Sequence, residues 1–161
     1  VERARARVPE AALRTTVITG FPGESEAAFD KLLAFVDEGW FRHLGAFAYS
    51  PEEGTPAAGL PGQVPAALAA ARRDQILEAQ RGVSRRWNNG EVGRTVDVLV
   101  EGPSAEHDWV VVGRTAAQAP EIDGITYLEL CDAAPGTILP CVVTDASDYD
   151  LVARPENNEE A

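Results

Sequence analysis

The sequence predicts an α/β segment followed by a small all-β barrel. Within residues 13–87, strand-like apolar runs alternate with amphipathic helical runs, which is typical of parallel α/β structure. Residues 95–153 contain five short strand-like runs separated by turn residues, which favours a five-stranded barrel of the OB type. Charge divides the chain at the same place. Residues 1–89 carry 11 acidic and 11 basic side chains, whereas residues 90–161 carry 15 acidic and 3 basic.

The first elements lead to a glycine-rich loop. A helix over residues 1–7 ends before Pro9, because the residue that precedes a proline is disfavoured in the α conformation. A strand follows over residues 13–19, where Val17 and Ile18 are apolar and β-branched. It stops at the loop 20–24 (GFPGE). This loop is either an ordinary tight turn or part of a ligand site, since α/β folds bind ligands beyond the carboxyl ends of their strands.

The next elements continue the α/β pattern. A helix over residues 25–38 has Ser25 as its N-cap and Gly39 as its stop signal. Its apolar face is formed by Phe29, Leu32, Leu33, Val36 and Trp40. A strand over 44–49 follows, and this spacing implies a parallel, right-handed crossover.

A long helix over residues 65–87 then ends at the sequence 88–90 (NNG). Its register is marked by Leu68, Ala71, Ile76, Leu77, Gln80 and Val83. Its charged side chains are expected to face solvent for the most part: Arg72, Arg73, Asp74, Glu78, Arg81, Arg85 and Arg86.

The barrel strands are expected over residues 95–101, 109–115, 125–130, 138–144 and 149–153. Pro140 indicates an edge or a bulge in its strand. For Trp109 and Tyr127, packing in the core is the preferred interpretation, although both could stack on bases if the barrel bound RNA. The domains predicted are therefore 1–87 and 90–155, followed by a disordered tail over 156–161.

Composition restricts the class of protein. The 161 residues include no methionine, and two strands cannot close a parallel sheet, so we expect the chain to be the last part of a larger protein. No apolar run is long enough to span a bilayer, and no signal peptide pattern is present. Cys131 and Cys141 are either a redox pair or, as we prefer, two small apolar residues in strands, which suits a reducing cytoplasm. His43 and His107 have no acidic or thiol partner at motif spacing, so no catalytic role is expected for them.

Five segments resemble one enzyme family in chain order. Residues 14–26 (RTTVITGFPGESE) and 49–57 (YSPEEGTPA) are similar to two motifs of the radical S-adenosylmethionine methylthiotransferases. Arg72, Arg73 and Gln80 match the helix that follows in that family. Residues 113–124 (GRTAAQAPEIDG) and 148–152 (DYDLV) resemble the TRAM domain appended to it. The resemblance implies the C-terminal part of a partial, TIM-like radical SAM barrel followed by a small OB-like TRAM barrel.

The resemblance also implies cofactors that this chain would hold only in part. The family uses S-adenosylmethionine and two 4Fe–4S clusters, whose cysteine ligands lie upstream, and neither Cys131 nor Cys141 matches them. Expected cofactor-binding residues are Thr16, Ile18, Gly20, Tyr49 and Ser50, with Ile18 and Gly20 near the adenine. Expected substrate-binding residues are Arg14, Glu121 and Asp123. Alternatively, Arg14, Thr15 and Thr16 only pack between strand and helix.

The expected partner is inferred from the branch of the family that the chain resembles and from its charge. With Glu52 and Glu53, the segment 49–57 resembles that of the family members that methylthiolate the β-carbon of an aspartate in a small-subunit ribosomal protein. An acidic barrel suits a basic ribosomal protein better than nucleic acid. The ribosome is a further candidate partner, and no membrane partner is expected. The chain alone is expected to be inactive. Two alternatives stay open: a tRNA-modifying methylthiotransferase, and a free-standing acidic binding module without enzymatic activity.

Overall fold

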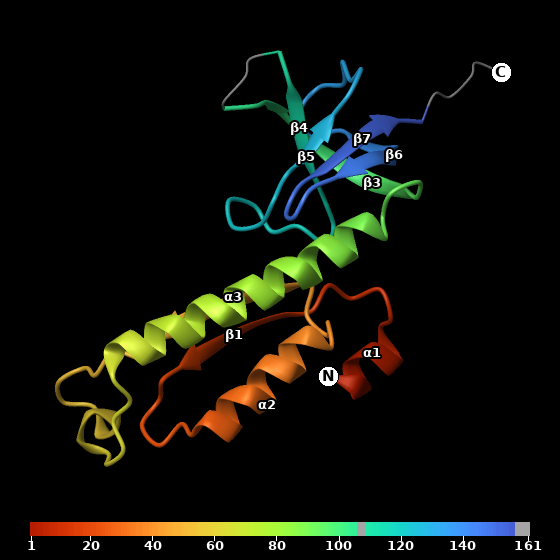
Figure 1. Ribbon diagram of the computed structural model, residues 1–161. Coiled ribbons are helices and arrows are strands. Elements are labelled where there is room, and N and C mark those ends of the chain that lie inside the picture. The colour runs from red at the N-terminus through yellow and green to blue at the C-terminus, as the bar shows by residue number, and fades with distance from the viewer. Residues whose placement is uncertain (106–108, 157–161) are drawn as a thin grey trace. The chain divides into compact units, whose positions relative to one another are not determined.

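The computed structural model describes residues 1–105 and 109–156 (Figure 1). The chain divides into two units, Val1–Val83 and Ser84–Ala161, and each is described by itself. The elements in chain order are α1 (Glu2–Arg7), β1 (Arg14–Thr19), α2 (Glu26–Asp37), β2 (His43–Ala48), the 3₁₀ helix η1 (Pro56–Gly59), α3 (Ala66–Asn89), β3 (Thr95–Pro103), β4 (Val111–Thr115), β5 (Thr126–Leu128), β6 (Ile138–Ala146) and β7 (Leu151–Pro155).

In the first unit, α2 and α3 pack on one face of a two-stranded parallel sheet (Figure 1). β1 pairs with β2 from Arg14 opposite His43 to Thr19 opposite Ala48, which confirms the expected parallel pairing. Side chains alternate between the two faces of a strand, so one face alone meets the helices. The core on that face contains Phe29, Val36, Ala46 and Ile76, with Val17, Leu32, Leu33, Leu44 and Ala79 packed against it.

The ends of α2 are capped as its sequence predicts. The hydroxyl of Ser25 accepts a hydrogen bond from the amide of Ala28 at 3.2 Å, which satisfies one of the free N–H groups of the first turn. Gly39 follows the helix with φ of +77°, a conformation that glycine adopts without the penalty of a side chain. The helix boundaries in this unit are therefore encoded locally.

The register predicted for α3 is partly wrong. Leu68 and Leu77 are 41% and 39% exposed, whereas Arg72, expected to face solvent, is only 3% exposed. The buried face follows the spacing of three and four residues through Ala69, Arg72, Ile76, Gln80 and Val83. Hydropathy alone favours leucine over arginine at such positions, but the arginine is compensated by acidic partners described below.

The second unit contains a closed barrel with strand order β3-β4-β5-β7-β6 (Figure 1). All pairs are antiparallel except β5 and β7, which run parallel. The core is built from Val98, Val100, Leu128, Cys141 and Ala153. The five-stranded, OB-like barrel expected from the sequence is therefore confirmed.

Two expectations within the barrel need correction. Trp109 is 83% exposed, so it does not pack in the core. For Pro140 only the bulge is wrong, because the bulge in β6 lies between Val143 and Asp145, whereas the expected edge position fits the pairing with β7. Pro140 pairs with Asp97 of β3 and lies one residue outside the last β6–β7 pair, formed by Cys141 and Pro155, so no ladder bond to β7 needs its missing N–H.

The sequence predicts a disordered tail over residues 156–161, and this prediction is wrong for Glu156. Glu156 donates its amide to the carbonyl of Pro140 at 2.9 Å, and its carboxylate accepts from the hydroxyl of Thr95. Residues 157–161 lie outside the described part of the chain.

Among the described residues, none of the helices has the length and apolar character needed to cross a membrane.

Candidate functional site

The face of the β1–β2 sheet opposite the helices carries three of the predicted site residues. Arg14, Thr16 and Ile18 alternate with the residues that meet the helices, so all three lie on this face. Their partners on β2 are His43, Gly45 and Phe47. We call this set of six residues the open face of the sheet.

The open face has an apolar part near the carboxyl ends of the strands. Ile18 is 54% exposed and its partner Phe47 is 62% exposed. Thr16 is also exposed, whereas Thr15 is half-buried on the side of the helices. Packing between strand and helix thus describes Thr15 but not Arg14 or Thr16.

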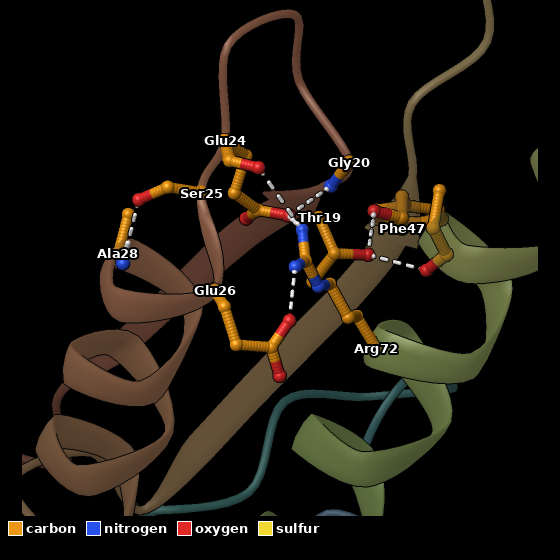
Figure 2. Close-up of polar contacts among 9 residues, drawn as sticks. Thr19, Gly20, Glu24, Ser25, Glu26, Ala28, Phe47 and Arg72 are labelled. Carbon is orange, nitrogen blue, oxygen red and sulfur yellow. Dashed lines mark hydrogen bonds and ion pairs between the residues drawn. The ribbon is translucent and has the colours of Figure 1, made fainter. Parts of the chain in front are cut away.

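Gly20 begins the loop beyond β1 and is buried against α3. Its φ is +75°, and an added Cβ would overlap the Cβ of Ala69 and lie 3.0 Å from its Cα. Beside it, the hydroxyl of Thr19 donates to the carbonyl of Ala69 at 2.9 Å (Figure 2). Close packing on the helix therefore requires glycine here. The amide of Gly20 donates to Glu24 and is therefore occupied within the chain.

A buried arginine holds the loop in place. Figure 2 shows the guanidinium of Arg72 between the carboxylates of Glu24 and Glu26, at 2.8 Å from each. It also donates to the carbonyl of Glu24 at 3.2 Å and lies 5.1 Å from the centre of the Phe29 ring. Glu24 in turn accepts from the amide of Gly20 at 2.7 Å. A chain of charge-assisted hydrogen bonds thus joins α3 to the end of β1.

The surroundings of Arg72 favour its charged, protonated form. The hydrogen bond to Glu26 raises the pKa of Arg72, and Glu24 contributes in the same direction, whereas burial opposes them. Sequence reasoning missed this role, although the spacing of Arg72 from Ala69 and Ile76 places it on the buried face and could have indicated it. Gln80 on the same face donates to the carbonyl of Arg42 at 3.1 Å, which anchors the start of β2.

Tyr49 extends the pairing of the two strands by one step. Its amide donates to the carbonyl of Thr19 at 2.8 Å, and its ring meets that of Phe21 edge-on at 5.3 Å. Its hydroxyl is buried and has no hydrogen-bond partner among the described residues. Ser50 follows and is exposed. The strand ends therefore present the exposed hydroxyl of Ser50 and an apolar surface, a combination that suits a small ligand with a ring and polar groups. The buried hydroxyl of Tyr49 adds a polar group that lacks a partner among the described residues.

The predicted site residues of the second unit lie in the loop between β4 and β5. Asp123 accepts from the amide of Ala119 at 2.7 Å, so it shapes the loop. Glu121 is exposed and has φ of +62°. Behind the loop, the buried side-chain oxygen of Gln118 accepts from the amide of Thr115 at 2.9 Å and from the hydroxyl of Thr126 at 2.8 Å. The arrangement presents Glu121 to solvent and uses Asp123 internally.

Both cysteines are free thiols in the barrel. Cys141 is fully buried, and burial raises the pKa of its thiol to about 11. Cys131 packs against the same core. Within residues 1–105 and 109–156, no three His, Cys, Asp or Glu side chains are grouped so as to hold a metal ion. His43 lies on the open face, and His107 is outside the described residues.

Comparison with known proteins assigns the barrel. Residues 92–155 match the family described as the TRAM domain. These residues are a TRAM domain. The match covers all five strands and the loop that carries Glu121.

The whole chain is also similar to named enzymes. It is 51% identical over 152 residues to "Ribosomal protein uS12 methylthiotransferase RimO" of Anaeromyxobacter sp. (strain K), which covers 94% of the chain and 32% of that protein. Proteins of the same name from Syntrophus aciditrophicus and Thermosynechococcus vestitus are 49% and 46% identical, over 95% and 94% of the chain and 34% and 33% of theirs. The chain thus spans about a third of the length of these relatives. The similarity to methylthiotransferases expected from the motifs is confirmed.

Proposed function

We propose that this chain is part of a radical S-adenosylmethionine enzyme that methylthiolates an aspartate of a small-subunit ribosomal protein. The observation that carries the proposal is the similarity to uS12 methylthiotransferases over 94% of the chain, TRAM domain included. The iron–sulfur clusters would be held outside this chain, because the residues described here offer no metal ligands in a group. The enzyme would act in the cytoplasm, where its ribosomal substrate is made.

The open face would form one wall of the cofactor site. Ile18 supplies an apolar surface for the adenine ring, and the neighbouring Phe47 extends it. Thr16, Ser50 and the unsatisfied hydroxyl of Tyr49 would bind polar groups of S-adenosylmethionine. The cofactor would supply the radical chemistry, while these side chains bind and orient it.

The ion pairs of Arg72 with Glu24 and Glu26 would hold that wall in place. Because Glu24 holds the amide of Gly20, the carbonyl of Gly20 faces a fixed direction at the end of β1. A ligand contact through that carbonyl would then require no further ordering of the loop. Arg14, at the other end of the same face, is proposed to contact the substrate.

The acidic barrel would bind the substrate protein. Residues 90–161 carry 15 acidic and 3 basic side chains. Ribosomal proteins are basic, so opposite charges would speed and orient their association with the barrel. Glu121 is proposed to contact the substrate directly, and Asp123 to act by shaping the loop that presents it.

The test uses the complete gene product, reconstituted with iron and sulfide without oxygen. We expect it to add one methylthio group to an aspartate of purified uS12 when S-adenosylmethionine is supplied, measured by mass spectrometry. Modification of tRNA but not of uS12 would favour the tRNA-modifying alternative. A gene product without the C-x-x-x-C-x-x-C cluster motif would favour a binding module without enzymatic activity.

A further inference from the structure

Leu130 is displayed by the TRAM domain in a costly backbone conformation. Its φ is +52°, and it is one of two non-glycine residues with positive φ in the described part of the chain. Its side chain is 89% exposed. A bulky side chain in the left-handed region is disfavoured by sterics, and here no burial compensates for it.

The fold requires this turn but not a leucine. The amide of the preceding Glu129 still bonds to the carbonyl of Ala153 at 2.9 Å, and the chain then turns so that Cys131 and Ala133 pack on the barrel core. Glycine or asparagine would make the same turn with less strain. The backbone conformation and the exposure of this position therefore do not themselves favour a leucine.

A second large, exposed apolar residue lies at the same end of the barrel. β4 and β5 pair with Val111 opposite Leu128. Trp109 lies two residues before the first of these, and Leu130 two residues after the second. The chain enters β4 and leaves β5 at the same end of the barrel (Figure 1). Trp109 is 83% exposed, so the two most exposed large apolar residues of the described chain lie beside one strand pair.

Charge around this corner selects the kind of partner. Glu129 and Asp132 lie on either side of Leu130 in the sequence, and both are exposed. Leu128 pairs with Ala153 of β7, so the exposed Arg154 follows the last residue pair of these two strands. The other two arginines of the barrel are in ion pairs, Arg94 with Glu91 and Arg114 with Glu101. A phosphate backbone would be repelled here, whereas a basic segment would be attracted.

We infer that Trp109 and Leu130 form the anchor by which the TRAM domain grips an apolar side chain within a basic segment of its protein substrate. The inference rests on the proposed function, because the partner is the substrate named there, and it assigns the contact to one corner of the barrel. Interface hot spots are enriched in tryptophan, and the buried centre of an interface lies within a polar rim.

The test measures binding of purified uS12 to the 161-residue chain by calorimetry, together with urea unfolding of the chain. Leu130→Asn keeps the turn and removes the apolar side chain. We expect this variant to be more stable than the wild type and to bind uS12 at least tenfold more weakly. A side chain with a purely structural role would give the opposite change in stability. The matched control is Val92→Asn, an apolar residue that is 44% exposed before the start of β3 and should change the affinity less than twofold.

The outcomes separate this inference from the proposed function. Unchanged affinity in Leu130→Asn, or equal loss in Val92→Asn, overturns the anchor while the enzymatic proposal stands. Binding that depends on Leu130, without methylthiolation by the complete gene product, supports the anchor and overturns the enzyme. Failure of the wild-type chain to bind uS12, or tighter binding of tRNA through Trp109, overturns the anchor.

Discussion

Substitution of Gly20 by alanine would disturb the contact between the GFPGE loop and α3 more than any other glycine substitution in this loop. Two costs combine at this position. A φ of +75° is strained for alanine, and the new Cβ would overlap the Cβ of Ala69. The backbone strain is about 1–2 kcal/mol. Forcing a methyl group into a packed site adds about 1–3 kcal/mol. The expected total is a loss of about 2–5 kcal/mol in the free energy of unfolding.

A matched control separates the two costs. Gly54 has φ of +83°, and a Cβ there would meet nothing within 4 Å. Gly54→Ala should therefore lose only the backbone term, about 1–2 kcal/mol. The measurement is urea unfolding followed by circular dichroism, with the free energy extrapolated to water.

A rescue variant identifies the clashing partner. Ala69→Gly removes the Cβ that the new methyl group would strike, at a cost of about 1 kcal/mol for glycine within a helix. The double variant Gly20→Ala/Ala69→Gly should be more stable than the sum of the two single changes predicts, by about 1 kcal/mol or more. Additive effects, or equal losses in Gly20→Ala and Gly54→Ala, would refute the packing explanation for this glycine.

Three further predictions concern the two cores. Gln118→Leu should lose about 2–4 kcal/mol in urea unfolding, because it leaves buried donors of Thr115 and Thr126 without an acceptor. Ile76→Ala should lose about 2–5 kcal/mol in the same assay, since the side chain is fully buried in the core of the first unit. Cys141 should resist alkylation in the native chain up to about pH 10, as followed by mass spectrometry, because burial raises the pKa of its thiol to about 11.

Each of these predictions has a control residue that is exposed or only half-buried. Gln75→Leu and Leu77→Ala change side chains that are exposed on α3 and should stay within about 0.5 kcal/mol of wild type. Cys131 is only half-buried and should be alkylated before Cys141.

The raised pKa of Cys141 also lowers the free energy of unfolding at alkaline pH. Its contribution is complete below the usual value of 9.0 and is lost as the pH rises to about 11.

The strands were predictable because local sequence determines them. Apolar β-branched runs mark β1, β3 and β6, and each ends where a glycine, proline or polar residue interrupts the pattern. The cap at Ser25 is equally local, since the hydroxyl reaches an amide three residues away. The 3₁₀ helix at 56–59 has no such repeat and was not predicted.

The side chains that support the site could not be found in this way. Arg72 is buried because Glu24 and Glu26, 48 and 46 residues before it, meet it in space. Its neighbours in the helix contain no sign of these partners. Trp109 shows the reverse case: hydropathy favours burial, but its position before β4 leaves it exposed. Long-range contacts thus decide the residues that sequence patterns assign wrongly.

The predicted site was partly recoverable from alternation alone. Once residues 14–19 are a strand, Arg14, Thr16 and Ile18 must share a face. The sequence did not reveal that Gly20 is required by the packing of α3, because Ala69 lies 49 positions further along the chain. Nor did it reveal the unsatisfied hydroxyl of Tyr49 or the contact of its ring with Phe21, since both depend on the folded chain.

The open face as a wall of the cofactor site is the central claim, and the affinity for S-adenosylmethionine tests it most directly. The measurement compares the dissociation constant in the complete, reconstituted gene product for wild type, Ile18→Ala and Phe35→Ala. Ile18 lies on the open face, whereas Phe35 is an apolar residue of α2 that is 38% exposed. Loss of an apolar contact worth about 1.5 kcal/mol predicts roughly tenfold weaker binding for Ile18→Ala and no more than a twofold change for Phe35→Ala. Equal affinity in all three proteins would contradict the claim.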